Sequence, residues 1–229
     1  MPTSSAVLFA SSNTHKYEEA KKILSGFGIE LGFFQTELIE IQDDSLSKIA
    51  SQMALNAYEK CKNPVIIEDD GLFINSLSGF PGPYSSYVFK TIGNNGILKL
   101  IEDRTGKRLQ DVDEPLTYDN YERIKGQGWS ATKKIVGDDR DAQFVAIIAF
   151  CDSSNEPTLF ESSVAGTISK NIQDGGWGYD PIFIPENQPR PTLPPFSLKT
   201  YAELDNKNKL SHRYESLKKF ASWFNSKRE

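Results

Sequence analysis

The chain has 229 residues, a net charge of −5 and a hydrophobic fraction of 38%. This length is enough for one domain with a sizeable core, or for one domain with an added lobe. The acidic balance argues against general nucleic-acid binding, so a site for a polyanion has to be a local basic pocket.

Cysteine usage and hydropathy favour a soluble, cytoplasmic protein. The two cysteines, Cys61 and Cys151, lie far apart and lack metal-ligand spacing, so free thiols in a reducing compartment are expected. The apolar run 6–10 is too short for a signal peptide, and no stretch is long enough to cross a bilayer. We therefore expect no membrane partner.

The chain begins with an alternation of predicted strands and helices. Apolar residues 6–10 predict a buried strand, and Asn13 or Thr14 can cap a helix that runs to about residue 25. Residues 31–36 predict a second strand.

A second helix and a third strand follow. Ser45 is predicted to cap a helix with one apolar face at three-and-four spacing, made of Leu46, Ile49, Ala50, Met53, Ala54 and Ala57. Residues 65–68 predict a third strand, buried on both faces. This order favours an α/β fold with a mixed sheet.

An acidic triplet, Glu68, Asp69 and Asp70, stands at the predicted end of the third strand. Three adjacent carboxylates are unfavourable unless a cation neutralises them. Mg²⁺ binds through one or two carboxylates plus substrate phosphates. A solvated strand-to-turn junction, with Gly71 as the turn residue, explains the same residues without a ligand.

The middle of the chain predicts less regular structure. Glycines and prolines in 79–86 indicate a rigid loop, and 93–101 predicts a helix. Residues 102–141 are polar and charge-rich and predict an inserted segment, with a short hairpin near 126–129.

The last third predicts two strands, a loop and a helix. The strands are residues 144–150 and 158–168, and the proline-rich segment 185–195 has to be a loop. Ser211 is predicted to cap a final helix with one apolar face, made of Leu217, Phe220, Ala221 and Phe224.

The segment between the first strand and the first helix predicts phosphate binding. It consists of Ser11, Ser12, Asn13, Thr14, His15 and Lys16. The N–H groups of a helix start bind anions, and Lys16 in the first turn is unfavourable there unless an anion lies beside it. The segment lacks the glycines of a P-loop.

Two further segments are candidates for ligand binding. Trp177 and Tyr179 lie among glycines and offer aromatic faces for stacking a planar base, although a core Trp at a turn has the same pattern. His212 and Arg213 place potential cations in the first turn of the last helix, where anions are preferred, although a surface His and Arg is the simpler reading of that segment alone.

Together, residues 12–16, 68–72, 79–85, 177–181 and 211–213 resemble the Ham1-type inosine triphosphate pyrophosphatases, in the family's order. The resemblance implies one pyrophosphatase domain over 1–229 with an insertion within 102–141. It also implies an elongated mixed sheet with flanking helices, and two lobes around a nucleotide-binding cleft. Finally, it implies a homodimer, a Mg²⁺ cofactor and cleavage of ITP, dITP or XTP to the monophosphate and pyrophosphate.

The resemblance also assigns roles. Asp69 is the general base and a metal ligand, with Glu40 as the second metal carboxylate. The substrate-contacting residues are the phosphate segment Ser11, Ser12, Asn13, Thr14, His15 and Lys16, the base pocket Trp177, Gly178, Tyr179, Asp180, His212 and Arg213, and also Lys207 and Asp70.

Three features depart from the family pattern: Asp70 replaces the usual Ser or Thr, Trp177 stands where Phe is common, and the 102–141 segment is long. Asp70 could add a metal ligand, raise the pKa of Asp69 or alter a phosphate contact. Two alternative functions remain open: a Maf-like pyrophosphatase of other nucleotides, and a nucleotide-binding protein with impaired catalysis.

Overall fold

The computed structural model describes residues 7–105, 140–189 and 197–227. The chain divides into two compact units. Unit 1 comprises Met1–Asp70, Val145–Ser163 and Asn208–Glu229, and unit 2 comprises Gly71–Phe144 and Val164–Lys207. The chain therefore passes from one unit to the other several times.

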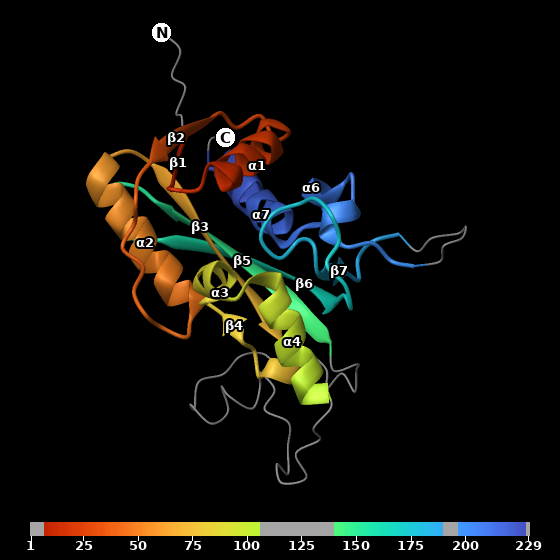
Figure 1. Ribbon diagram of the computed structural model, residues 1–229. Helices are drawn as coiled ribbons and strands as arrows, with labels where there is room; N and C mark the ends of the chain where they lie inside the picture. The colour runs from red at the N-terminus through yellow and green to blue at the C-terminus, as the bar shows by residue number, and fades with distance from the viewer. Residues whose placement is uncertain (1–6, 106–139, 190–196, 228–229) are drawn as a thin grey trace. The chain divides into compact units, whose positions relative to one another are not determined.

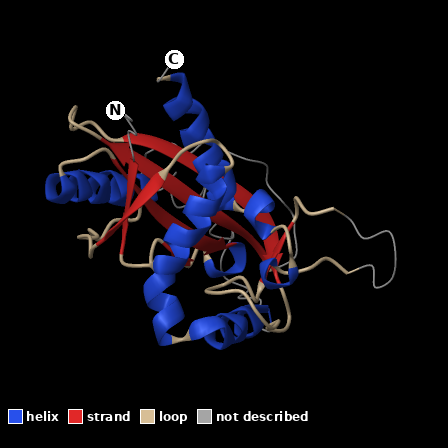
Figure 2. Ribbon diagram, turned by 90° about the horizontal axis from the view of Figure 1, so that it is seen from above, coloured by secondary structure: helices blue, strands red, loops and turns tan. Residues whose placement is uncertain are grey.

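The strands form one open mixed sheet in the order β2-β1-β3-β5-β6-β7, with β4 paired to β3. Figure 2 shows the strands in red and the helices in blue. Their bounds are β1 Val7–Ser11, β2 Leu31–Gln35, β3 Val65–Ile74, β4 Pro81–Gly82, β5 Asp141–Cys151, β6 Thr158–Ile168 and β7 Phe183–Pro185. β1 is parallel to both β2 and β3, whereas β4 is antiparallel to β3 and β7 to β6. The predicted α/β class with a mixed sheet and flanking helices is confirmed.

The helices include every one that the sequence predicted. Their bounds are α1 Thr14–Ser25, α2 Leu46–Cys61, α3 Ser85–Thr91, α4 Gly93–Thr105, α6 Lys207–Leu210 and α7 His212–Ser226, with short 3₁₀ turns at Asn75–Leu77 and Tyr201–Glu203. Asn13, Ser45 and Ser211 cap α1, α2 and α7 with their side chains, as predicted. No described helix is both long and apolar enough to cross a membrane.

Unit 1 has an aromatic-rich core beneath two helices. α1 and α7, far apart in the sequence, pack side by side (Figure 1). Every apolar position predicted for the faces of α2 and α7 is buried. Phe150 and Phe160 make edge-on or tilted contacts with Phe220 and Trp223 of α7. This packing fixes the start of α7, where His212 and Arg213 lie.

Unit 2 has its own core, which holds the second set of candidate residues. Phe144 lies 4.8 Å from Phe183 and 6.5 Å from Tyr179, between ring centroids. The buried Ser85 hydroxyl accepts a hydrogen bond from the Leu72 N–H at 2.8 Å and donates one to the Gly82 carbonyl at 2.7 Å. The predicted rigid loop is thereby tied to β3 directly after the acidic triplet.

The prediction that the acidic triplet ends its strand is wrong. β3 continues through Glu68, Asp69 and Asp70 to Ile74. The strand continues because cations neutralise two of the carboxylates, as the site below shows. Gly71 is an extended strand residue and not a turn, and a Cβ there would lie 2.7 Å from the carbonyl oxygen of Gly82.

Four short elements were not predicted as helices or strands: β4, which lies in the predicted rigid loop, α3, β7 and α6. α3 is made largely of β-branched and aromatic residues, which are weak helix formers, but the buried Val88 anchors it. β7 begins two residues before the predicted proline-rich loop, and its last residue is the first residue of that loop. α4 runs to Thr105, into the segment where an insertion was predicted. The hairpin predicted near 126–129 lies outside the described residues.

Candidate functional site

The acidic triplet of unit 1 is divided between the two faces of β3. Glu68 and Asp70 are two residues apart, so their side chains lie on one face, and Arg213 contacts both. Its Nε donates to Glu68 Oε1 at 2.8 Å and Oε2 at 2.7 Å, and its Nη2 donates to Asp70 Oδ2 at 2.9 Å. The Arg213 Nη1 pairs with Glu19 of α1. One fully buried guanidinium therefore joins three carboxylates.

Lys16 meets the same network from the first turn of α1. Its Nζ lies 3.1 Å from Asp70 Oδ2, the oxygen that Arg213 also contacts. Burial alone would raise the pKa of Asp70, but Lys16 and Arg213 outweigh it and hold that pKa well below its usual range. Burial likewise opposes the charge on Lys16, yet Asp70 and Glu68 raise its pKa. Lys16 and Asp70 are thus a charged pair.

Asp69 lies in a different environment from its two neighbours. Its Oδ1 accepts a hydrogen bond from the Asp70 N–H at 3.0 Å, while its Oδ2 is buried and has no hydrogen-bond partner in the described part of the chain. Burial raises the pKa of Asp69 to about 7, with Asp70 and Glu40 adding to the rise and Lys16 opposing it. Asp69 therefore offers an unused oxygen in a site with excess negative charge.

The carboxylates of Asp69 and Glu40 suit a hard cation only if a bound substrate supplies further oxygen ligands. Within the described ranges, no three or more His, Cys, Asp or Glu side chains gather into a metal-binding group. Asp69 Oδ2 has no hydrogen-bond partner within those ranges, and Glu40 is an exposed carboxylate whose charge adds to the rise in the pKa of Asp69. Mg²⁺ usually binds through one or two carboxylates and completes its octahedron with water and phosphate oxygens, so this donor set fits it.

The predicted phosphate segment is held by its own side chains. The N–H of Asn13 donates to Ser11 Oγ at 3.0 Å, and Asn13 Oδ1 accepts from the N–H groups of His15 at 3.0 Å and Lys16 at 3.3 Å. These three N–H groups are thus engaged within the segment. The side chains of Ser12, Thr14 and His15 are exposed. The Lys16 ammonium is left as the principal cation that the segment offers to an anion.

Unit 2 brings Trp177, Asp180 and Lys207 together. Lys207 Nζ lies 2.6 Å from Asp180 Oδ2 and 5.1 Å from the centroid of the Trp177 ring. The same Asp180 oxygen accepts a hydrogen bond from the Trp177 N–H at 3.2 Å. The indole and the ammonium are therefore held by one buried carboxylate, which presents an aromatic ring and a cation side by side.

The remaining residues of the predicted base pocket anchor that turn. The buried Tyr179 donates its hydroxyl proton to the Ser85 carbonyl at 2.9 Å, and Asn94 donates to the Gly178 carbonyl at 3.1 Å. Gly176 has φ +65°, and a Cβ there would lie 2.7 Å from the Cβ of Asp180. The backbone of the turn thus requires glycine next to the aromatic residue.

His212 and Arg213 are both buried, at 4% and 1% exposure. The cationic side chain of Arg213 in the first turn of α7 is compensated by Glu19, Glu68 and Asp70. The surface-residue explanation of this helix start is therefore wrong for both residues.

Two residues of this arrangement were missed in the sequence. Glu19, which pairs with Arg213, follows Lys16 by three positions and so lies on the same face of α1. This spacing is the one sequence signal that distinguishes Glu19 from its neighbour Glu18. Ser85, at the end of the Gly/Pro-rich segment, gave no signal of its role in tying that segment to β3.

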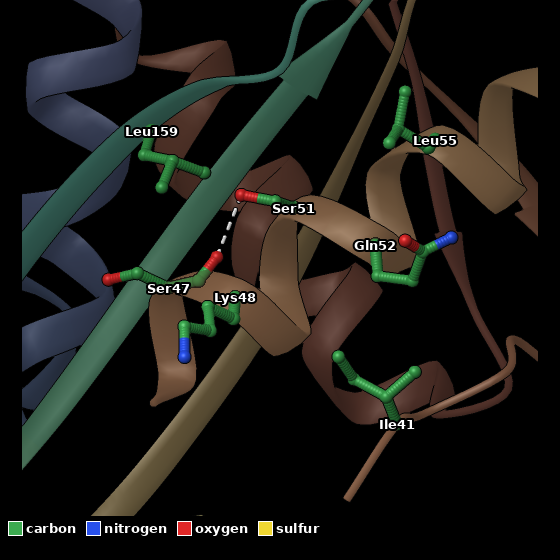
Figure 3. A pocket seen from close by; sticks show the side chains of 7 residues that line it. All are labelled: Ile41, Ser47, Lys48, Ser51, Gln52, Leu55 and Leu159. Carbon is green, nitrogen blue, oxygen red and sulfur yellow. Dashed lines mark hydrogen bonds between the residues drawn. The ribbon is translucent and has the colours of Figure 1, made fainter. Parts of the chain in front are cut away.

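A pocket of about 380 Å³ lies elsewhere in unit 1, along α2 (Figure 3). Its lining is Ile41, Ser47, Lys48, Ser51, Gln52, Leu55 and Leu159. None of the predicted site residues lines this pocket, so the pocket and the charged cluster are separate features.

Comparison with known proteins places these residues in a family. The Ham1 family model matches residues 7–113 and 119–223, which leaves out only five residues between them, inside the segment where the sequence predicts an insertion. The dITP/XTP pyrophosphatase of Methanopyrus kandleri is 38% identical over 221 residues, covering 95% of each chain. That of Korarchaeum cryptofilum is also 38% identical, covering 93% of this chain and 92% of the relative.

Solved structures share the fold. A HAM1 protein from Coxiella burnetii matches with a TM-score of 0.66 at 25% identity, covering 96% of this chain and 98% of the other. The Staphylococcus aureus Ham1 protein matches with a TM-score of 0.60 at 23% identity, covering 97% and 99%, and supports the fold alone.

Proposed function

Because the chain belongs to the Ham1 family, we propose that it hydrolyses the non-canonical purine nucleoside triphosphates dITP, XTP and ITP to the monophosphate and pyrophosphate. The observation that carries the proposal is the buried Oδ2 of Asp69, which has no hydrogen-bond partner among the described residues and which feels the charge of Lys16. Unit 1 thus offers a carboxylate base and a cation for phosphate that interact electrostatically.

Asp69 is the general base in this proposal. Its pKa of about 7 in the metal-free protein matches a base that works near neutral pH. The carboxylate orients a water molecule against the α-phosphorus and takes its proton, while the pyrophosphate leaves. Asp69 and Glu40 would hold Mg²⁺, which supplies neutralisation of the charge that develops on the phosphate oxygens.

Lys16 is proposed to hold the β- and γ-phosphates. Its ammonium is a compact charge on a flexible stem, so it can follow a phosphate oxygen without movement of α1. Arg213 fixes Glu68 and Asp70 on the other face of β3, and thereby fixes the backbone that carries Asp69.

Base recognition is proposed for the residues of unit 2. His212, at the start of α7 in unit 1, stays a predicted substrate-contacting residue. Trp177 offers a ring for stacking, and Lys207 offers a donor to the 6-oxo group of hypoxanthine or xanthine. Adenine has a 6-amino donor at that position, so the donors of the protein would be left unpaired, which is heavily penalised. We further propose a homodimer in the cytoplasm.

A second candidate function has one observation in its favour. The Lys16 ammonium is already paired with Asp70, at the position where the family resemblance leads us to expect an uncharged Ser or Thr. Nucleotide binding without turnover would follow if this pair did not open.

Hydrolysis of XTP in ¹⁸O-labelled water tests the reaction. Attack at the α-phosphorus predicts label in the monophosphate and unlabelled pyrophosphate as the second product. Orthophosphate with a nucleoside diphosphate would contradict the assignment, and binding without any product would favour the second candidate.

A further inference from the structure

The ion pair between Lys16 and Asp70 has a consequence for every phosphate that binds this site. Both side chains are largely buried, at 15% and 18% exposure, and their charged atoms are 3.1 Å apart. A phosphate oxygen that contacts the Lys16 ammonium must therefore share it with, or take it from, a carboxylate that is already in place.

Asp70 does not depend on Lys16 to remain in position. Its Oδ2 also accepts a hydrogen bond from Arg213 Nη2 at 2.9 Å, and that guanidinium is 1% exposed and is fixed by Glu68 and Glu19. The flexible partner is the Lys16 side chain, which can turn from the carboxylate to a phosphate and back. Arg213 therefore holds the Asp70 carboxylate in place beside the Lys16 ammonium.

We propose that Asp70 is an internal anion that competes with the phosphates of substrate and product for Lys16, and so limits how tightly pyrophosphate is retained. The proposal rests on the proposed function, because it takes pyrophosphate as the product. Asp70 is a positioning residue here: it acts through Lys16 and reclaims the ammonium when pyrophosphate leaves.

Isothermal titration calorimetry with inorganic pyrophosphate, with and without Mg²⁺, tests the proposal on the full chain. Asp70→Ser and Asp70→Asn are each expected to lower the Kd for pyrophosphate by about tenfold, the size of one charge-assisted hydrogen bond. Asp70→Glu, which keeps the anion, is expected to stay near the wild-type Kd. An unchanged or higher Kd in both neutral variants would overturn the proposal, since Asp70 would then assist binding or play no part.

Two further variants separate competition from net charge. Asp43→Asn removes the same charge from an exposed pair with Lys48 in unit 1, and it is expected to leave the Kd unchanged. In a Lys16→Met background, Asp70→Ser is expected to lose most of its effect, because there is no ammonium to compete for. An equal gain without Lys16 would show simple repulsion and contradict the proposal.

The kinetic signature differs from that of a structural role. Asp70→Ser is expected to lower KM for dITP and to increase inhibition by added pyrophosphate. The free energy of unfolding in urea, measured for the same variant, identifies any loss of folding. The calorimetric result does not need turnover. If the wild type hydrolyses no nucleotide, the proposed function is refuted. If the Asp70→Ser variant nevertheless binds pyrophosphate more tightly than the wild type, this inference still stands.

Discussion

Asp69 and Asp70 are consecutive residues of β3, yet their carboxylates have opposite environments. Asp70 Oδ2 lies within 3.1 Å of two cations, Lys16 and Arg213. Asp69 Oδ2 is buried with no hydrogen-bond partner among the described residues, and its pKa is raised to about 7. The alternation of a strand explains the difference, because neighbouring side chains point to opposite faces.

Asp69→Asn is expected to reduce kcat for dITP by at least about a hundredfold, because an amide cannot take the proton from water. The measurement is steady-state release of pyrophosphate, with the circular dichroism spectrum as the check on folding. Asp43→Asn is the matched control and should retain wild-type activity. A folded Asp69→Asn protein with near-normal turnover would show that another group is the base.

The same substitution should stabilise the metal-free protein at high pH. Asp69 has a higher pKa in the folded state than in the unfolded chain, so its ionisation destabilises the fold progressively from about pH 4 up to about pH 7. Urea unfolding should therefore find nearly equal stability for wild type and Asp69→Asn near pH 4, and a variant about 4 kcal/mol more stable at pH 8. A variant that is less stable at pH 8 would contradict the raised pKa.

Arg213→Met should strongly destabilise unit 1, because it leaves Glu68 buried without its cation. Loss of one partner of a buried ion pair typically destabilises by about 3–5 kcal/mol, measured by urea unfolding at pH 7. Lys48→Met, which breaks an exposed pair, should change stability by no more than about 0.5 kcal/mol.

A second change distinguishes lost charge compensation from lost packing at Arg213. Adding Glu68→Gln to Arg213→Met should restore part of the stability, because the fully buried carboxylate at position 68 is then replaced by a neutral amide. If the double variant is as unstable as the sum of the two single variants, then the contribution of Arg213 is packing and not charge.

Lys207→Met should act on substrate recognition rather than on the chemical step. The substitution removes the ammonium 2.6 Å from Asp180 and 5.1 Å from the Trp177 ring. KM for dITP is expected to rise about tenfold with kcat little changed, as for the loss of one charged hydrogen bond. Lys209→Met, at an exposed neighbouring position, is the control. A fall in kcat at constant KM would place Lys207 in the chemistry instead.

The parts of the fold that depend on local pattern could be predicted from the sequence. The apolar face of α2 and the caps Asn13, Ser45 and Ser211 needed only helical spacing and capping chemistry. α3 and β7 could not, because they are short and are held by tertiary contacts that override weak propensities.

The site was predictable as a set of residues but not as an arrangement. Motif order identified Lys16, Asp69 and Arg213: Lys16 and Arg213 lie in the ion-pair network of unit 1, and Asp69 lies next to it in the chain, on the other face of β3. The partners of Arg213 were not predictable, because Glu19 and Glu68 reach it from positions 194 and 145 residues away. The role of Asp70 depends on two cations that only the folded chain brings together.

The most direct test of the central claim is pyrophosphate release from dITP, XTP, ITP, GTP, ATP and UTP, each with and without Mg²⁺. We predict release from dITP, XTP and ITP that depends on Mg²⁺ and exceeds release from ATP and UTP by at least about a hundredfold in kcat/KM, the discrimination expected when donors are left unpaired. Equal rates for dITP, ATP and UTP would contradict the account.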